Sequence, residues 1–402
     1  MSSLPALVPI DDARAELLSR LPRLCSAESI ITKDCVGRVL AEDVIAPIDV
    51  PPRPNSSMDG YAIAFDDVSG VDAILRVSQR VPAGHAPAPL DKGSAARIFT
   101  GGEIPDGADT IVIQEDVRVL ENGAIQINEM PSKGEWVRAA GLDISTGERV
   151  IPAGTRLTPA AIGVCASLGI THLSVFKRLK VALLSTGDEL VEPGLPLAAG
   201  KIYNSNRQLI GTLIEQAGFE WVDMPRVDDS ADATVSALKQ AVANADAIIT
   251  TGGVSVGEED HVKSAITSLG TLDLWRIRIR PGKPFAAGEI DGTPIFGLPG
   301  NPMSSLVTFA LLARPCLMHL QGASYRTPLT LPVRSGITRA ALKRDEFMRV
   351  MITEGVATAV GSQNSGVLSS ALTADGLLHL PAFEAIEKGK TYNFIPFSAL
   401  IG

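Results

Sequence analysis

The distribution of hydrophobic residues changes in kind along the chain. Between residues 178 and 325, short apolar runs alternate with longer segments in which apolar residues recur every three or four positions. Runs of the first kind are typical of buried strands, and segments of the second kind are typical of amphipathic helices. Strands that alternate with helices form parallel sheets, because each parallel pair needs a crossover connection. This region therefore predicts a doubly wound, mostly parallel α/β domain with helices on both faces.

The expected elements of this domain follow from the same pattern. Strands are expected at residues 181–185, 245–250, 274–279 and 293–297. Helices are expected at about residues 205–217, 232–243 and 260–268, and a last helix runs to about residue 320. The stretch TPIFGLPGNPMSSLVTFALL (293–312) combines a strand, a turn rich in glycine and proline, and a helix that we expect to be capped by Ser304 and Ser305.

The remaining sequence consists mainly of short runs rich in β-branched residues. Residues 11–24 differ, because an acidic start followed by helical spacing predicts a short amphipathic helix. We expect residues 141–176, with a short helix at 159–168, to pack back onto residues 27–50. The predicted division is an N-terminal helical segment (1–26), a discontinuous β-rich linker domain (27–50 and 141–176), a small β domain (51–140), the α/β domain (177–326) and a C-terminal β domain (327–402).

Composition and charge narrow the classes of function. Of the 402 residues, 45% are hydrophobic and 20% are charged, which is ordinary for a globular protein with several cores. A net charge of −9 and an aromatic content of 4% argue against nucleic acid as a partner. The four cysteines are scattered and form no C-x-x-C pair, which argues against a disulfide framework and a structural zinc site.

The sequence also predicts a cytoplasmic location. The first residues, MSSLPALVPIDDARAELLSRL, lack the basic start and unbroken apolar run of a signal peptide. No uninterrupted apolar run approaches the roughly eighteen residues that span a bilayer. We therefore expect neither secretion nor a membrane partner.

Two polar turns follow strands of the predicted sheet. In LLSTGDELVEPG (183–194), Ser185, Thr186 and Gly187 end the strand, and Asp188 and Glu189 follow at once. In IITTGGVSVGEEDHVK (248–263), hydroxyls and glycines precede an acidic triplet, namely Thr250, Thr251, Gly252, Gly253, Glu258, Glu259 and Asp260. Such groups at the carboxyl ends of strands suit phosphate and a hard cation. Simple capping of a turn or helix remains the structural alternative.

A basic segment, RIRIRPGKPFAAG (276–288), follows. Its alternating Arg276, Arg278 and Arg280 are expected on one face of the strand at 274–279. The first two fit a solvated charged face, whereas Arg280 and Lys283 flank a Pro-Gly turn, which is a better place for an oxyanion. Helix starts such as that in 293–312 also favour anions, so the chain predicts a ligand with several phosphate-like groups. Neither a dinucleotide fingerprint nor a P-loop is present.

Taken in order, seven stretches of the chain resemble one known family. They are PPRPNSSMDGYA, FTGGEIPDGADTIVIQED, STGDEL, IYNSNRQLI, TTGGVSVGEEDHV, RPGKPFAAG and FGLPGNPMSSLVTF. This set is similar to the molybdopterin molybdenumtransferase (molybdenum insertase) family, to which the related regions of gephyrin and of plant molybdenum cofactor enzymes belong. The resemblance covers nearly the whole chain.

The resemblance implies an elongated, four-part subunit that forms a homodimer. The substrates would be adenylylated molybdopterin, handed over by a molybdopterin adenylyltransferase, and molybdate. The enzyme would insert molybdenum into the dithiolene, cleave the phosphoanhydride and release AMP, with Mg²⁺ or another divalent cation. The active site would lie between the α/β domain of one subunit and the domain containing Met58–Asp59–Gly60 of the other.

The resemblance also implies roles for individual residues. The catalytic residues would be Asp59, Asp188, Glu189, Asp228, Asp260 and Lys283, of which Asp188, Glu189 and Asp260 would hold the metal. The substrate-binding residues would be Thr100, Ser185, Thr186, Gly252, Gly253, Ser255, Arg280, Pro284, Pro299, Asn301, Pro302, Ser304, Arg349 and Ser369. Among these, the resemblance assigns Arg280, Lys283, Ser304, Arg349 and one of Ser365, Ser369 and Ser370 to the molybdate pocket.

Some alternatives stay open at this point. Many family members carry lysine where this chain has Arg280, and the basic run expected before Gly141 is reduced to Arg138. A molybdopterin adenylyltransferase is the nearest rival function, because the region 178–325 resembles that enzyme as well. A non-catalytic scaffold or an inactive paralogue is the other alternative, although Asp59, Asp188, Asp228 and Asp260 are all present.

Overall fold

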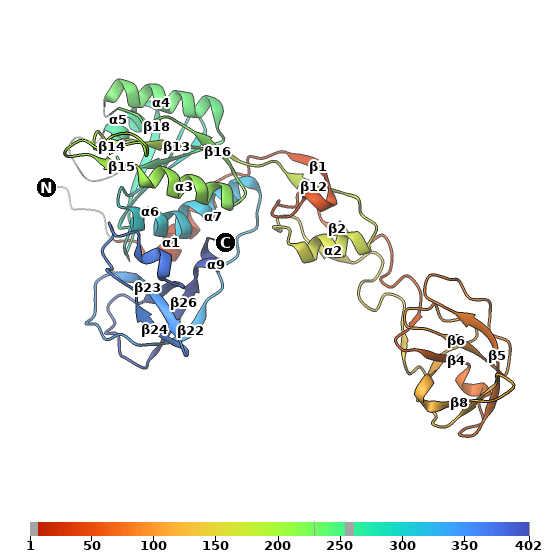
Figure 1. The fold of residues 1–402 in the computed structure, drawn as a ribbon. Coiled ribbons are helices and arrows are strands. Elements are labelled where there is room, and N and C mark those ends of the chain that lie inside the picture. Colours follow the sequence, from red (N-terminus) through yellow and green to blue (C-terminus); the bar gives the residue numbers. More distant parts are fainter. Residues whose placement is uncertain (1–6, 229, 254–260, 402) are drawn as a thin grey trace.

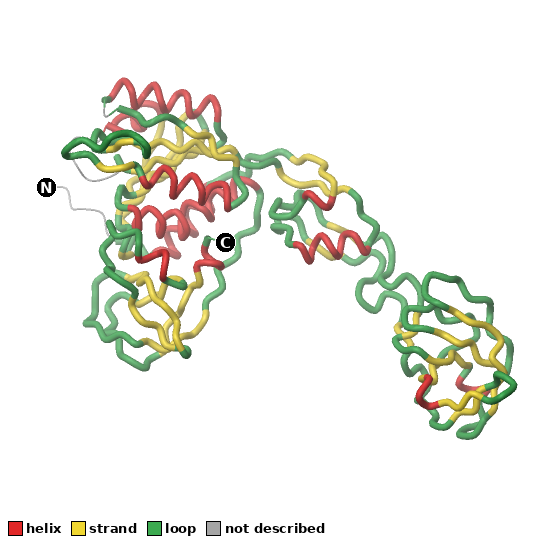
Figure 2. Tube along the Cα trace, in the orientation of Figure 1, coloured by secondary structure: helices red, strands yellow, loops and turns green. Residues whose placement is uncertain are grey.

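The computed structural model describes residues 7–228, 230–253 and 261–401. Its shape is elongated, as Figure 1 shows. The α/β domain and the C-terminal β domain lie together at one end, a small linker domain follows, and a separate β domain occupies the far end. Figure 2 shows that most helical residues gather at the first end, whereas the far domain consists mainly of strands and loops. The predicted fold class is confirmed.

The α/β domain is built on a six-stranded sheet with the order β16-β13-β17-β21-β20-β18. The first four strands are parallel, and the last two are antiparallel to their neighbours. The strands are β13 (Lys180–Ser185), β16 (Glu220–Asp223), β17 (Ala247–Thr251), β18 (Gly270–Arg276), β20 (Pro284–Ile290) and β21 (Thr293–Leu298). The helices are α3 (Ser205–Gln216), α4 (Ala231–Asn244), α5 (His261–Leu269), α6 (Pro302–Thr308) and α7 (Arg314–Gln321), with a π-helical turn at Phe309–Ala313 between the last two. A two-stranded flap, β14 (Leu190–Val191) and β15 (Ile202–Tyr203), precedes α3.

Helices cover both faces of this sheet because successive strand residues point to opposite sides. Val181 and Leu183 pack with α3, α6 and α7, whereas Ala182 and Leu184 pack with α4 and α5. All four side chains are buried, which explains the continuous apolar run in the sequence.

The predicted strand at 274–279 is wrong in its extent. Strand β18 ends at Arg276, and residues 279–280 form a separate strand, β19, that pairs in parallel with β23 (Asp345–Thr353) of the C-terminal domain. The connection at Ile277 is fully buried, and Arg278 donates its backbone N–H to the carbonyl of Val8. The three arginines therefore do not share one strand face, and the strand β20 that precedes β21 was missed.

The N-terminal helix, α1 (Ile10–Arg20), belongs to the α/β core. Its buried face, Ile10, Ala13 and Leu17, packs in the same cluster as α7. That cluster also contains Phe347 and Ile395 of the C-terminal domain. One continuous core therefore holds the α/β domain and the C-terminal domain together.

The C-terminal domain is a six-stranded sheet in the order β19-β23-β24-β22-β26-β25, closed by a further pairing of β23 with β25. Its own elements are β22 (Leu331–Ser335), β23, β24 (Val356–Ala359), α8 (Ser370–Thr373), β25 (Gly376–Leu380), β26 (Thr391–Pro396) and α9 (Phe397–Leu400). Strand β19 thus comes from the α/β domain. Its pairing with β23, called the seam below, joins the two domains.

The linker domain is formed by two separate parts of the chain. Strand β1 (Ala27–Ile31) pairs with β12 (His172–Phe176), and β2 (Val44–Ile45) pairs with β11 (Arg149–Ile151). A short 3-10 helix, η1 (Thr32–Asp34), and α2 (Pro159–Ser167) complete it. Its core includes Leu40, Cys165 and Val175.

The far domain, which lies between the two parts of the linker domain in sequence, contains a six-stranded sheet in the order β7-β4-β6-β5-β9-β8. The elements are β3 (Asn55–Ser56), β4 (Gly60–Ile63), η2 (Phe65–Asp67), β5 (Ile74–Val81), β6 (Ser94–Ile98), β7 (Thr110–Ile113), η3 (Gln114–Asp116), β8 (Val117–Val119), β9 (Ile125–Ile127) and β10 (Val137–Arg138). Strands β3 and β10 pair where the chain enters and leaves the domain.

One helical stretch, Pro302–Gln321, is long and apolar enough to cross a membrane by length and composition, with a mean hydropathy of 1.3. This stretch is not an uninterrupted apolar run, because it contains Arg314 and His319. Moreover, 83% of the eighteen-residue window that reaches this hydropathy is buried inside the protein. It is the central helix of the α/β core, which explains its apolar composition.

Candidate functional site

Three parallel strands end at the same edge of the α/β sheet. Ser185 lies beside Thr251, and Thr251 lies beside Leu298. The hydroxyl oxygens of Ser185 and Thr251 are 3.0 Å apart, and Gly252 donates its N–H to the carbonyl of Leu298 at 3.1 Å. The structure therefore brings the turns after the three strands together, with Ser185, Thr186, Gly252, Gly253, Pro299, Asn301 and Pro302 among their residues.

The acidic residues at this edge are arranged around Arg226, which sequence reasoning missed. The Arg226 Nη2 lies 2.5 Å from Asp228 Oδ1, and its Nη1 lies 3.9 Å from Asp188 Oδ1. Each carboxylate side chain is 73% exposed. Arg226 thus reduces the repulsion between the two acids, while both stay accessible to a ligand.

Two of the three expected metal ligands, Asp188 and Glu189, belong to the described residues. Glu189 is exposed next to Asp188, whereas Asp260 lies outside the described residues, as does Ser255, which was expected to bind substrate. Within residues 7–228, 230–253 and 261–401, no group of three or more His, Cys, Asp or Glu side chains is placed to hold a metal ion. The described residues thus offer hard oxygen ligands, but they do not form a complete metal centre by themselves.

A second feature is a cavity of about 310 Å³ between the α/β domain and the C-terminal domain. Three cationic side chains line it, Arg280, Lys283 and Arg344, and none of the described residues of its lining is acidic. The other lining residues are Pro281, Gly282, Pro284, Ser304, Gln363, Asn364 and Ser365. The cavity therefore suits a small, highly charged anion. Arg344 was missed because it follows Arg280 by more than sixty residues in the sequence.

The turn from Arg280 to Pro284 owes its position to Gly282. This glycine has a φ of +102°, and a Cβ added there would lie 2.6 Å from Cγ2 of Thr308 in α6. Only glycine allows the turn to approach the helix this closely without a shift. The approach places Lys283 beside Ser304, so that both line the cavity.

Helix α6 does not begin with a serine cap, so that prediction is wrong. Asn301 is the N-cap residue without a side-chain hydrogen bond, and Pro302 is the first helical residue. Proline suits that position because its missing N–H would have no helical partner. Ser304 and Ser305 lie within the first turns, and Ser305 Oγ donates to the carbonyl of Pro299. Ser304, in contrast, lines the cavity.

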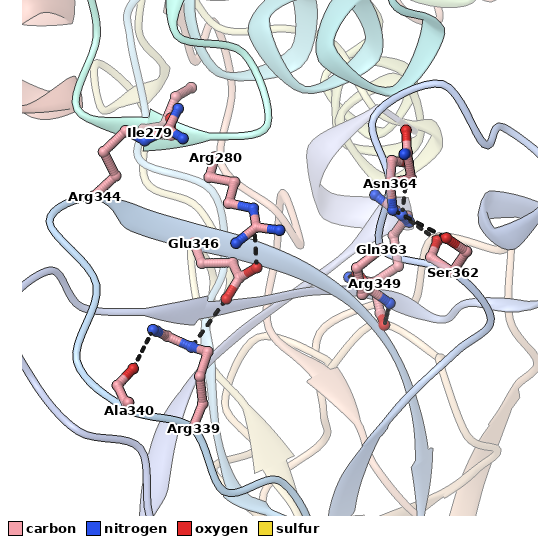
Figure 3. Close-up of polar contacts among 10 residues, drawn as sticks. All are labelled: Ile279, Arg280, Arg339, Ala340, Arg344, Glu346, Arg349, Ser362, Gln363 and Asn364. Atoms are coloured by element: carbon pink, nitrogen blue, oxygen red, sulfur yellow. Dashed lines mark hydrogen bonds and ion pairs between the residues drawn. The ribbon is translucent and has the colours of Figure 1, made fainter.

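The opposite wall of the cavity is a loop of the C-terminal domain, residues 362–365. Arg349 lies beneath it with an exposed fraction of 0%. Its Nη2 donates to the carbonyls of Ser362 and Asn364 at 2.6 and 3.2 Å, as Figure 3 shows. Burial lowers the pKa of the Arg349 guanidinium, while its Nε and Nη1 have no hydrogen-bond partner in the part of the chain that the structure describes. Arg349 therefore shapes the wall rather than lining the cavity.

Of the three serines left open by the sequence, Ser365 lines the cavity. Ser369 is exposed immediately before α8 and is not part of the lining, and Ser370 is buried within α8. Which serine reaches the cavity depends on the packing of loop 362–365 over Arg349. This packing is a tertiary contact that the local sequence does not reveal.

Asp59 and Thr100 form a third feature, in the far domain. The Oδ1 of Asp59 accepts hydrogen bonds from the N–H and the hydroxyl of Thr100, both at 2.8 Å. These two bonds, the backbone one first, lower the pKa of Asp59 below its usual value. The residues adjoin β4 and β6, which Figure 1 places at the opposite end of the chain from the α/β domain. One protomer therefore does not bring them to the other site residues.

Comparisons with known proteins agree along the whole chain. Three sequence models match in order: MoeA N-terminal region (domain I and II) over residues 8–169, probable molybdopterin binding domain over residues 182–319, and MoeA C-terminal region (domain IV) over residues 333–397. A molybdopterin molybdenumtransferase from Haemophilus influenzae is 35% identical, and the alignment covers 98% of this chain and 100% of that protein.

Two further relatives support the same relationship. A molybdopterin molybdenumtransferase from Nostoc sp. is 37% identical, with 88% of this chain and 85% of that protein covered. The crystal structure of the molybdopterin biosynthesis moeA protein from Pyrococcus horikoshii superimposes with a TM-score of 0.83 at 27% identity, covering 97% of this chain and 100% of that one.

Proposed function

The chain belongs to the molybdopterin molybdenumtransferase (MoeA) family, and from this premise we propose that it inserts molybdenum from molybdate into adenylylated molybdopterin and releases AMP. The observation that carries the proposal is the cationic cavity between the α/β domain and the C-terminal domain, next to the strand ends that would hold the nucleotide. The two features give separate places to the two substrates, which the reaction requires.

The cavity is proposed to bind molybdate. This oxyanion is a tetrahedral dianion, and guanidinium, ammonium and hydroxyl groups are the side chains that bind such ions well. Arg280, Lys283 and Ser304 would contact it. Ser365, one of the three serines that the sequence left open, and Arg344, which the sequence did not single out, would contact it as well. Arg349 would contribute by holding the loop in place, and Pro284 by shaping the wall.

The strand ends are proposed to bind the nucleotide and phosphate part of the other substrate. Backbone N–H groups and hydroxyls at the carboxyl edge of a parallel sheet commonly bind phosphates. Asp188, Glu189 and Asp260 would hold Mg²⁺, whose charge would offset that of the anhydride during cleavage. Asp228 would lie beside these phosphates.

The chain is proposed to act as a homodimer in the cytoplasm. The Asp59–Thr100 pair lies at the far end of the elongated protomer, so a second copy would have to supply it to the α/β domain. The same arrangement would allow handover of the substrate from a separate adenylyltransferase.

The rival function of adenylyltransferase is supported less well. The matching relatives cover the β domains as well as the α/β domain, and they are named molybdenumtransferases. The test is the release of AMP from adenylylated molybdopterin by the purified chain with Mg²⁺, measured with and without molybdate. Release that depends on molybdate supports the proposal. Consumption of ATP with molybdopterin, without molybdate, would instead support the rival, and the absence of both activities would favour a scaffold.

A further inference from the structure

A buried carboxylate lies directly behind the cationic cavity without lining it. The side chain of Glu346 is 6% exposed, at the start of β23. Its Oε1 lies 3.7 Å from Nε of Arg280, and its Oε2 lies 3.0 Å from Nε of Arg339. Figure 3 shows the carboxylate between the two guanidinium groups. Buried acids are rarely retained without a positively charged partner, and here the partner on one side is a cavity residue.

The contact follows from the seam between the two domains. Arg280 lies opposite Glu346 in the parallel pairing of β19 with β23. The neighbouring pair on the same seam is Arg278 with Asp345, whose Nε and Oδ2 are 3.0 Å apart. Arg344 donates from Nη1 to the carbonyl of Ile279 at 3.2 Å. The backbone register thus fixes where the carboxylate stands relative to Arg280.

The contact with Glu346 depends on the guanidinium group of Arg280, which carries N–H donors on three separate nitrogens. The Arg280 side chain is 48% exposed, so it would sample many rotamers at the rim of the cavity if nothing held it. Glu346 faces its Nε, which leaves the two terminal nitrogens for an anion. A lysine would have to meet both partners from its single nitrogen, without the planar pair of terminal nitrogens that arginine presents to an anion.

Charge alone predicts the opposite effect. Glu346 is a negative group next to a cavity that would bind a dianion, so its field opposes binding. Retaining it there is useful only if the position of Arg280 matters more than the lost attraction. On this ground we propose that Glu346 is a positioning residue that fixes the Arg280 guanidinium for molybdate binding, with Arg339 holding the other oxygen of the carboxylate.

The inference rests on the proposed function, and a binding measurement separates the two. Molybdate is titrated into the full chain by calorimetry, for the wild type and for Glu346→Gln. The expected result is a dissociation constant for molybdate that rises about tenfold in the variant, in the range of coupled neighbouring residues. A constant that is unchanged or lower contradicts the inference, because loss of the negative charge alone strengthens anion binding.

A control variant guards against a purely structural explanation. Asp345→Asn removes the adjacent buried acid of the same seam, which contacts Arg278 and His379 and does not line the cavity. It should lower the melting temperature as Glu346→Gln does, yet change the molybdate constant less than twofold. An equal loss of affinity in Asp345→Asn would mean that loosening of the seam is the cause, and would overturn the inference.

A second substitution at the same position covers failure of Glu346→Gln to fold. Glu346→Asp keeps the charge but withdraws it from Arg280, and it should weaken molybdate binding by a similar factor. In the Arg280→Gln background, Glu346→Gln should no longer weaken molybdate binding and should strengthen it slightly, because only the loss of the negative charge is left to act; an additional loss of affinity of equal size would contradict the inference. If the wild type itself binds no molybdate, the proposed function and the inference both fail. If the wild type binds and Glu346→Asp binds as well, only the inference fails.

Discussion

The backbone N–H of Met303 donates to the carbonyl of Ser365 at 3.0 Å, which joins the first turn of α6 directly to the loop of the C-terminal domain. The two walls of the cationic cavity are therefore linked by a hydrogen bond as well as by the β19–β23 seam. A cavity held in this way is organised before an anion arrives, so little ordering would be needed on binding.

We predict that Lys283→Ala lowers the rate of molybdate-dependent AMP release by roughly 100-fold or more, as loss of one preorganised donor to a reacting anion does. The fold should stay intact, because Lys283 lies at the cavity and not in a core cluster. The measurement is the steady-state rate together with the melting temperature.

Lys180→Ala is the matched control for this substitution. It removes the same charge from the opposite edge of the α/β sheet, where Lys180 makes a surface ion pair with Glu220. It should leave the rate unchanged. Wild-type activity in Lys283→Ala would exclude the assigned role of this lysine.

We predict that two inactive variants complement each other. Asp59 directly precedes β4 of the far domain, and Lys283 directly precedes β20 of the α/β domain, so the two substitutions lie in domains at opposite ends of one protomer (Figure 1). A two-fold, antiparallel pairing of protomers would bring the two positions to the same active site. A mixture refolded together should recover about a quarter of the wild-type activity, since half of the dimers would be mixed and each would keep one intact site. A mixture with no more activity than its components would contradict a shared site.

We predict that Gly282→Ala destabilises the protein. A side chain would be strained at a φ of +102°, and its Cβ would meet the Thr308 methyl group at 2.6 Å. The expected loss is about 2–4 kcal/mol in the free energy of unfolding, from backbone strain and overpacking together. Chemical denaturation measures it.

Gly292→Ala separates the two causes. Gly292 also has a positive φ, +77°, but an added Cβ would meet nothing within 4 Å. The Gly292→Ala variant should lose only about 1–2 kcal/mol in the free energy of unfolding, which is the cost of the backbone conformation. Equal losses at the two positions would show that the close approach to α6 is unimportant.

We predict that Thr100→Val raises the pKa of Asp59. The variant removes the hydroxyl donor but keeps the backbone N–H of residue 100, which has the larger effect on this pKa. The pKa should therefore rise but remain below that of an ordinary aspartate. Carboxyl-carbon NMR of labelled aspartate during a pH titration measures it.

The sign of the stability effect follows from the lowered pKa. A carboxylate whose pKa is lowered by folding stabilises the folded state above its unfolded pKa, and this contribution is lost as the pH falls through the folded value. In Thr100→Val, the folded-state pKa of Asp59 lies closer to its unfolded value. The stability that Asp59 contributes should therefore be smaller, and it should be lost over a narrower pH range whose lower limit is higher than in the wild type. An unchanged pKa in the variant would mean that the hydroxyl bond is not formed in solution.

The sequence was sufficient where local pattern decides the structure. The run Val181–Leu184 predicts a strand buried on both faces, and the two faces of the sheet are indeed covered by helices. Where a distant segment decides, the pattern fails. Residues 277–280 look like the continuation of a strand, but they leave the sheet to pair with β23, about 66 residues later.

The same limit applies to the candidate site. The basic turn and its glycine are local signals, which point to Arg280 and Lys283. Arg226, Arg344 and Glu346 carry no local signal, because only tertiary contacts bring them to their places. The expected serine caps of α6 failed for a related reason, since Pro302 starts the helix two residues earlier.

The central claim is that the cavity between the α/β and C-terminal domains binds molybdate. Anomalous diffraction at the molybdenum edge, from crystals of the full chain soaked in molybdate, tests it most directly. The account predicts a molybdenum peak inside the cavity, placed so that the oxygens of molybdate reach Lys283, Ser304 and Ser365, and this peak disappears in Lys283→Ala crystals. A peak elsewhere, with this cavity empty at full occupancy of the other site, would contradict the claim.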